Sequence, residues 1–324
     1  MRGAGCAWHV APRTSHVAFW YHRRVIASRA VQNFSHAALS PDPDLAVAAL
    51  MIARIEYPRL DAGPYLDRLD ALGHEAQRRV AQASIAPEDL PPRIDPVRYA
   101  RVMALNAYLF GELQFAGNDT HYEDPRNSCL NEVLDRRTGI PITLALLYLE
   151  VARRAGVDVE GVNFPGHFLL RCRAPRGMPN VDDLIIDAYH GGALLSEREL
   201  LRRYGDNETD AANVPARLLA RAAKPQILAR MLLNLKRVYV QMHSYPQARD
   251  VTELLLAVNP SAIDALRERG MLAYQLNDYS AALRDLQAYL QISAKENPDE
   301  GEREEHDRIW EHVKALRRRV ASLN

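Results

Sequence analysis

Two residues in the middle of the chain could do chemistry together. His167 and Asp187 each lie in a short apolar run, and turn-forming residues at 174–180 separate the two runs. If the runs pair as strands, the imidazole and the carboxylate come side by side. A carboxylate that orients an imidazole lets the ring act as a general base for a nearby nucleophile. The same pair can be purely structural, because two polar groups at the edge of a core satisfy each other.

A buried helix and a small sheet would have to position this pair. Pro141 fits the first helical position, and the residues from Ile142 to Ala155 are apolar on nearly every side, which predicts a helix inside a domain. Gly156 supplies its stop. Three extended runs follow, at 157–164, 167–173 and 183–189. Turn residues break them apart, so we expect a small antiparallel sheet with His167 and Asp187 on neighbouring strands.

Two motifs carry a resemblance to a known family. NSCLNEVLDRRTGIPITLALLYLEVARRAG (127–156) and GVNFPGHFLLR (161–171) resemble the SirB-type family of bacterial proteins, in which a transglutaminase-like domain precedes tetratricopeptide repeats. The resemblance runs from about Asp44 to the repeats near the C-terminus. It implies a helix-rich α+β fold. A helical N-terminal segment and a papain-related core with a small antiparallel sheet are followed by an all-α helical array.

The resemblance also identifies a missing nucleophile. Active transglutaminase-like enzymes carry a cysteine at the start of the buried helix, where the helix dipole and an imidazolium lower the thiol pKa. Pro141 or Ile142 occupies that place here, and the SirB-type branch itself reads Gly-Ile-Pro-Ile. His167 and Asp187 fall on the family's histidine and aspartate positions. We therefore expect a degenerate, non-catalytic site.

Three other side chains could supply a nucleophile. Cys129 lies one helix upstream and could approach His167, although it is more simply interpreted as a small helix residue. Thr143 is near the helix start, where its hydroxyl is expected to bond to backbone groups. Cys172 lies five residues beyond His167, so strand alternation puts it on the opposite face as an inert thiol. An active enzyme would use Cys129, His167 and Asp187.

A retained binding cleft is the alternative to a purely structural pair. Its expected lining is Asn127, Ser128, Pro141, Thr143, Gly166, His167, Asp187 and Tyr189. His121 and His190 are expected in exposed loops. No spacing of His, Cys, Asp and Glu resembles a metal site, and no glycine-rich phosphate loop is present. We therefore expect neither a metal nor a cofactor.

The composition argues against nucleic-acid-binding, membrane and disulfide-rich classes of protein. The 324 residues include 41 basic and 41 acidic side chains, so no global field draws the chain to nucleic acid or to a membrane surface. Three cysteines are too few for a disulfide framework, which favours a reducing, cytoplasmic location. No apolar stretch approaches the ~20 residues needed to cross a bilayer.

The chain divides into three expected segments. Residues 1–41 contain no Asp or Glu, which is typical of a disordered tail, a start codon placed too far upstream, or an organelle presequence. Residues 42–215 comprise a helical lead-in and the transglutaminase-like core. Residues 216–324 contain an internal repeat, because Tyr245 and Ala248 recur as Tyr279 and Ala282, an offset of 34 that is typical of tetratricopeptide repeats. Two repeat units are fewer than the ~3 that an array usually needs to be stable on its own. The repeats are therefore expected to dock on the core or on another subunit.

These patterns favour a protein-interaction adaptor. Stacked helix pairs present a concave surface for a protein or peptide partner. The family's name implies an indirect link to regulation of gene expression. Two alternatives remain open: a cysteine-dependent amidase or acyltransferase using Cys129, and a sensor of a peptide or small molecule.

Overall fold

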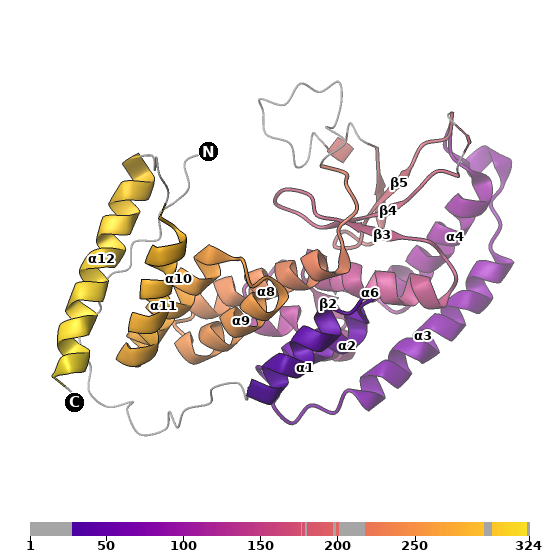
Figure 1. Ribbon diagram of the computed structural model, residues 1–324. Coiled ribbons are helices and arrows are strands. Elements are labelled where there is room, and N and C mark those ends of the chain that lie inside the picture. Colours follow the sequence, from indigo (N-terminus) through magenta and orange to yellow (C-terminus); the bar gives the residue numbers. More distant parts are fainter. Residues whose placement is uncertain are drawn as a thin grey trace.

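The central helix, α6 (Pro141–Arg154), lies at the middle of the protein (Figure 1). The computed structural model describes residues 28–175, 177–178, 180–196, 199–200, 218–294 and 300–322. Within α6, residues 141–148 and 150–152 are all buried. Pro141 lies in its first turn, and Gly156 follows its end with a φ of 72°, a conformation that glycine adopts without strain. The predicted helix is therefore confirmed, with each end shifted by one residue.

A four-stranded antiparallel sheet packs on α6 in the order β3-β4-β5-β6. The strands are β3 (Glu160–Val162), β4 (Leu169–Cys172), β5 (Leu184–Asp187) and β6 (Ala193–Leu195). Alternate side chains face opposite ways, as the pleat requires. Leu170 and Ile186 join the main core with α6, whereas Leu169 and Ile185 join a second cluster on the other face. Each of the three predicted runs thus contains a strand, although His167, expected on a strand, precedes β4 by two residues. β6 is an addition that the sequence did not indicate.

Helices before α6 form the lead-in. They are α1 (Ser28–Ala38), α2 (Leu45–Ala53), α3 (Gly63–Gln82), the 3-10 turn η1 (Pro87–Asp89), α4 (Pro96–Asn106), which runs into the π-helix η2 (Ala107–Glu112), the 3-10 turn η3 (Pro125–Ser128) and α5 (Leu130–Arg136). A two-residue parallel pair, β1 (Ala116–Gly117) with β2 (Thr138–Gly139), ties the loop after η2 to the chain entering α6. This lead-in is helical as expected.

The prediction of a disordered tail at residues 1–41 is wrong for the last third of that range. Residues 28–38 form α1, and Phe34 is 1% exposed and Ala38 is fully buried. The hydroxyl of Ser35 donates to the carbonyl of Ala257, so α1 packs on a helix near the other end of the chain. Burial of Phe34 and Ala38 in this helix packing explains why residues 28–38 form a helix despite their basic composition. Residues 1–27 lie outside the described part of the chain.

Within residues 218–294 and 300–322, five helices make up the C-terminal array. They are α8 (Lys224–Gln241), α9 (Tyr245–Val258), α10 (Ile263–Gln275), α11 (Tyr279–Ile292) and α12 (Glu300–Ala321). α9 and α11 begin at the two tyrosines of the 34-residue repeat, and the repeated alanines Ala248 and Ala282 are both fully buried. α12 closes the array at the end farthest from α3 and α4 (Figure 1).

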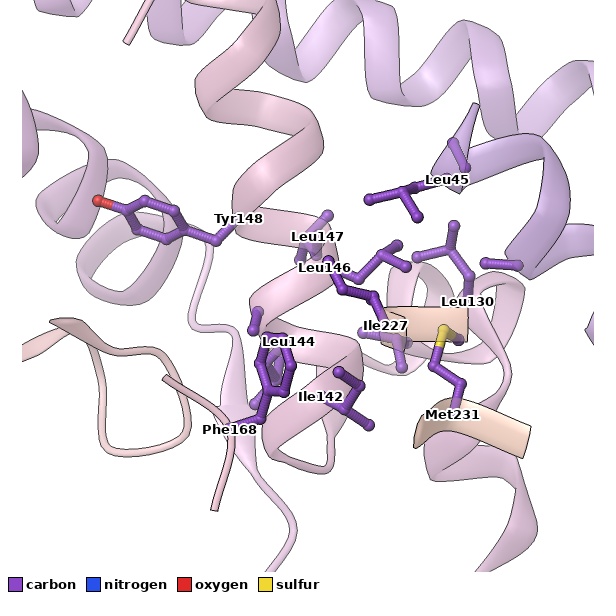
Figure 2. Packing of buried hydrophobic residues seen from close by; sticks show 14 of the residues in the cluster. Leu45, Leu130, Ile142, Leu144, Leu146, Leu147, Tyr148, Phe168, Ile227 and Met231 are labelled. Carbon is purple, nitrogen blue, oxygen red and sulfur yellow. The ribbon is translucent and has the colours of Figure 1, made fainter. Parts of the chain in front are cut away.

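The main hydrophobic core runs from the lead-in into the array. Leu45 of α2, Leu130 of α5, Leu146 of α6, and Ile227 and Met231 of α8 belong to the same buried cluster (Figure 2). α10, α11 and α12 share a separate cluster around Leu286 and Val313. The first helix pair of the array therefore docks on the core, as expected for an array of two units. The predicted boundary at 215/216 falls outside the described residues. No helix in the described part of the chain is long and apolar enough to cross a membrane.

Candidate functional site

Strand pairing brings His167 and Asp187 into direct contact. Asp187 is the last residue of β5, and His167 lies two residues before β4, after a turn in which Gly166 has a φ of 73°. Because β4 and β5 are antiparallel, the start of one lies beside the end of the other. Nε2 of His167 is 2.9 Å from Oδ1 of Asp187. The two side chains are 5% and 0% exposed, so the pair is buried.

A third residue, His190, completes the cluster. Its Nδ1 is 2.8 Å from Oδ2 of Asp187, and its side chain is 48% exposed. The N–H groups of Tyr189 and His190 also donate to Oδ1, and Gly191 and Gly192, with φ of 66° and 77°, continue the turn. The sequence placed His190 in an exposed loop without a role. The signal was the Asp-Ala-Tyr-His-Gly-Gly turn, which folds the histidine back onto the carboxylate.

The three side chains could hold a metal ion. The ligand atoms of His167, Asp187 and His190 all lie within 4.8 Å of one another. The sequence prediction of no metal site considered only spacing along the chain, whereas the pairing of β4 with β5 and the turn after β5 bring this trio together. Two nitrogens and a carboxylate are ligands that Zn²⁺ and related ions use in proteins.

Tyr189 connects this cluster to the loop that follows β1. Its ring meets those of His167 and Tyr122 edge to face, with centroids 6.2 Å apart in each case. Its hydroxyl donates to Oδ1 of Asp119 at 2.7 Å, and burial together with that carboxylate raises the pKa of Tyr189. Gly117 lies against the same ring, since a Cβ there would be 2.6 Å from it. The tyrosine therefore fills the space beside His167.

Asn127 is a structural junction. It is fully buried, and its side-chain oxygen accepts from Asn118 at 3.0 Å and from Arg136 at 2.8 Å. Its side-chain nitrogen donates to the carbonyl of His121 at 2.7 Å, and its carbonyl accepts from the Thr143 hydroxyl at 2.7 Å. With these bonds made inside the protein, Asn127 holds the loop against the start of α6.

The start of α6 carries no thiol. Pro141 is buried and Ile142 is 1% exposed, and Ile142 lies in the same core as Phe168, the residue after His167 (Figure 2). Thr143 is the polar residue of this turn: its hydroxyl accepts from the N–H of Ile140 at 3.1 Å. The expectation that this hydroxyl bonds to backbone is therefore confirmed. Ser128, also buried, ends η3 beside Cys129.

The two described cysteines are unsuited to nucleophilic attack. Cys129 is fully buried, and its sulfur bonds to the carbonyl of Pro125 at 3.7 Å. Burial, with the carboxylates of Glu56 and Glu132 nearby, raises the pKa of Cys129 and keeps it a neutral thiol. Cys172 is 4% exposed on the α6 face of β4, and burial raises its pKa to about 11. Cys6 lies outside the described residues.

Comparison with known proteins identifies the family. Residues 64–233 match the transglutaminase-like superfamily, which is more than half of the chain. The chain belongs to this superfamily. In this transglutaminase-like protein, residues 235–318 match the tetratricopeptide repeat, so the two modules follow each other as the resemblance implied.

Several proteins are similar in sequence to this transglutaminase-like chain. A UPF0162 protein of Xylella fastidiosa strain Temecula1 is 38% identical over 247 residues, covering 75% of this chain and 82% of the relative. UPF0162 protein YchA of Escherichia coli strain K12 is 26% identical over 258 residues, covering 80% and 87%. Human F-box only protein 21 is 37% identical over 180 residues, which is 53% of this chain and 28% of that protein.

Proposed function

We propose that this protein is a non-catalytic adaptor. In this role the tetratricopeptide helices bind a protein partner, and the transglutaminase-like domain keeps its His167–Asp187 pair without a nucleophile. The observation that carries the proposal is the start of α6, where Pro141, Ile142 and Thr143 offer no thiol and the Thr143 hydroxyl is bonded to backbone. An amide or acyl group next to His167 would have no activated nucleophile to attack it.

The outward face of α8 supports a partner site beside the core. Arg230, Leu233 and Arg237 follow one another at helical spacing, so they share one face. Arg230 donates to Asn163 at 3.1 Å, and Arg237 donates to Glu123 at 3.3 Å. Between them Leu233 is 45% exposed. An apolar side chain flanked by two guanidinium groups suits a partner segment that combines an apolar residue with acidic ones.

Point variants of the full chain test the partner site. We expect Leu233→Asp to abolish capture of the partner in an affinity pull-down quantified by mass spectrometry, because it places a carboxylate in an apolar contact. Val97→Asp is the matched control, since Val97 is 58% exposed on α4, outside the tetratricopeptide array. Equal partner profiles for wild type and Leu233→Asp would contradict this site.

A thiol probe tests the absence of catalysis. In a Cys6→Ser background, Cys129 and Cys172 are expected to react with a maleimide far more slowly than a free thiol at neutral pH, and at full rate after unfolding. Fast labelling of Cys129 that disappears in His167→Ala would instead support a cysteine amidase or acyltransferase. Burial of the Cys129 sulfur opposes that alternative.

The finer parts of the proposal rest on the family resemblance. Assignment to the SirB-type branch, a cytoplasmic location and an indirect role in regulation of gene expression come from the motifs at 127–156 and 161–171 and from composition. The balanced charge of 41 basic and 41 acidic residues supports a protein partner over direct DNA binding.

A further inference from the structure

Three metal-ligating side chains converge at the end of β5, and the adaptor role does not use them. Both imidazoles point a ring nitrogen at the same carboxylate, at 2.9 Å for His167 and 2.8 Å for His190. The ligand atoms of the three residues all lie within 4.8 Å of one another. We propose that His167, Asp187 and His190 bind a divalent transition-metal ion of the Zn²⁺ class.

The donor set selects this class of ion. Imidazole nitrogen suits Zn²⁺, Co²⁺, Ni²⁺ and Cu²⁺, whereas Ca²⁺ and Mg²⁺ take oxygen ligands. Two histidines and one carboxylate are three protein ligands, which leaves the fourth tetrahedral position to water or to a group from outside. The site is therefore of the open kind and not a closed structural site.

The separations fall on both sides of those that a bound ion requires. Ligand atoms about 2.0–2.1 Å from a tetrahedral ion lie about 3.3 Å from each other. His167 is 2.9 Å from Oδ1 of Asp187 and His190 is 2.8 Å from Oδ2, so these contacts must open by about half an ångström, and any separation between about 3.3 Å and the upper bound of 4.8 Å must close. Metal binding replaces the proton that each ring nitrogen shares with the carboxylate, and that proton moves to the other ring nitrogen or is released to solvent.

The surroundings of the trio also favour an ion. The backbone N–H groups of Tyr189 and His190 hold Oδ1 of Asp187 in place, which is how outer hydrogen bonds orient a metal-binding carboxylate. Asp187 and His167 are buried, so these two ligands are held in place by the protein on one side of the ion. The His190 side chain is 48% exposed and gives the ion a route from solvent.

Titration of the full chain with Zn²⁺ alone tests the proposal. After stripping with a chelator, isothermal titration calorimetry should show one Zn²⁺ per chain, and Co²⁺ should give visible absorption bands of a nitrogen- and oxygen-ligated ion. His190→Ala should weaken binding by at least about 100-fold, because removing a direct ligand costs more than removing an outer one. His190→Asn is a second variant, since its amide can still donate to Asp187 but ligates Zn²⁺ weakly.

The control variant is His121→Ala, an exposed histidine whose ring bonds to Thr120. It should bind Zn²⁺ like wild type, and circular dichroism melts should show that all variants fold. Wild-type binding no tighter than that of both His190 variants would overturn the proposal. So would equal weakening by His121→Ala. Partner capture repeated in chelator is a separate readout of the adaptor role, which needs no metal.

Discussion

The hydroxyl of Thr143 shows how one side chain can join two segments. It accepts from the N–H of Ile140 and donates to the carbonyl of Asn127, and Thr143 and Asn127 are fully buried. A buried polar group that loses its partner bears the full cost of desolvation. This threonine therefore stabilises the helix start that an active relative would use for catalysis.

We expect Thr143→Val to lower the free energy of unfolding by about 1–3 kcal/mol, since valine has the same shape but leaves the Ile140 N–H and the Asn127 carbonyl unpaired. Urea denaturation followed by circular dichroism measures the change. Thr120→Val, at an exposed threonine, should change stability by less than about 0.5 kcal/mol. Equal effects of the two substitutions would refute this role for the Thr143 hydroxyl.

At the scale of single residues, the sequence predicted those contacts that follow from a local sequence pattern. The contact between His167 and Asp187 could be expected, because two apolar runs separated by a turn pair as strands. His190 was missed, since it reaches Asp187 through the turn after β5, which the spacing of ligands along the chain does not reveal. The burial of Cys129 depends on packing from several helices and has no local signal.

The crossing of α3 over α6 depends on a residue without a side chain. Gly73 lies in the middle of α3, and a Cβ there would be 2.3 Å from Cβ of Arg154 at the end of α6. Arg154 in turn bonds to Asp70 of α3 at 2.7 Å, and that hydrogen bond lowers the pKa of Asp70. The close approach of the two helices and the ion pair therefore support each other.

Gly73→Ala should destabilise the protein by about 1–3 kcal/mol, because the clash with Arg154 outweighs the better helix propensity of alanine. Thermal unfolding measures the loss. Gly111→Ala in η2 is the control, because nothing lies within 4 Å of its added Cβ, and it should be neutral or stabilising. If Gly73→Ala is as stable as Gly111→Ala, the helices are not in contact as described.

The pairing of β3 with β4 is expected to depend on pH. Burial alone would raise the pKa of Glu160, but hydrogen bonds from Arg173 and Arg171, both at 2.7 Å, outweigh it and hold the pKa below its ordinary 4.5. A carboxyl with a lowered folded-state pKa adds stability above its unfolded-state pKa, and this is lost as pH falls through the folded value. Glu160→Gln should therefore flatten the loss of unfolding free energy as the pH falls below about 4.5.

Urea denaturation at several pH values checks this expectation. Glu304→Gln, at an exposed glutamate of α12, should leave the acid limb of the stability curve unchanged. An identical acid limb for wild type and Glu160→Gln would contradict a stabilising role for the carboxylate.

At the scale of elements, hydrophobic periodicity predicted the central helices well, but it did not predict α1 or the edge strand β6. α6 could be placed within one residue because its apolar run, Pro141 and Gly156 all agree. α1 was taken for part of a tail, since its order comes from contact with α9 and not from its own sequence. β6 is only three residues long, too short to show an alternation of its own.

At the scale of the molecule, the tetratricopeptide array is partly inside the main core. Six hydrophobic side chains of α8 are buried in that cluster: Ile227, Leu228, Met231, Leu232, Leu235 and Tyr239. At about 1.5–3 kcal/mol each, their burial contributes roughly 10 kcal/mol, which is comparable to the net stability of a whole domain. The 34-residue period indicated the array but could not show that its first helix completes another domain.

Truncation distinguishes a separate array from a shared core. We expect a chain ending at Ala216 to lose cooperative thermal unfolding, because α6 and α2 would lose the cover that α8 provides. A chain ending at Pro260 keeps α8 and α9 and should retain one cooperative transition at a lower Tm. Calorimetry with size-exclusion chromatography measures both. A cooperative, monomeric chain ending at Ala216 would show that the core is complete without α8.

The order in which these helices are synthesised determines how long apolar surface is exposed on the nascent chain. α6 is complete at Arg154, but α8, which packs on it, ends only at Gln241. At about 5–20 residues per second, the nascent chain exposes part of this buried helix for roughly 4–17 seconds before α8 is complete. Chaperones that hold exposed apolar segments should therefore engage this polypeptide during translation and leave it once α8 has been made.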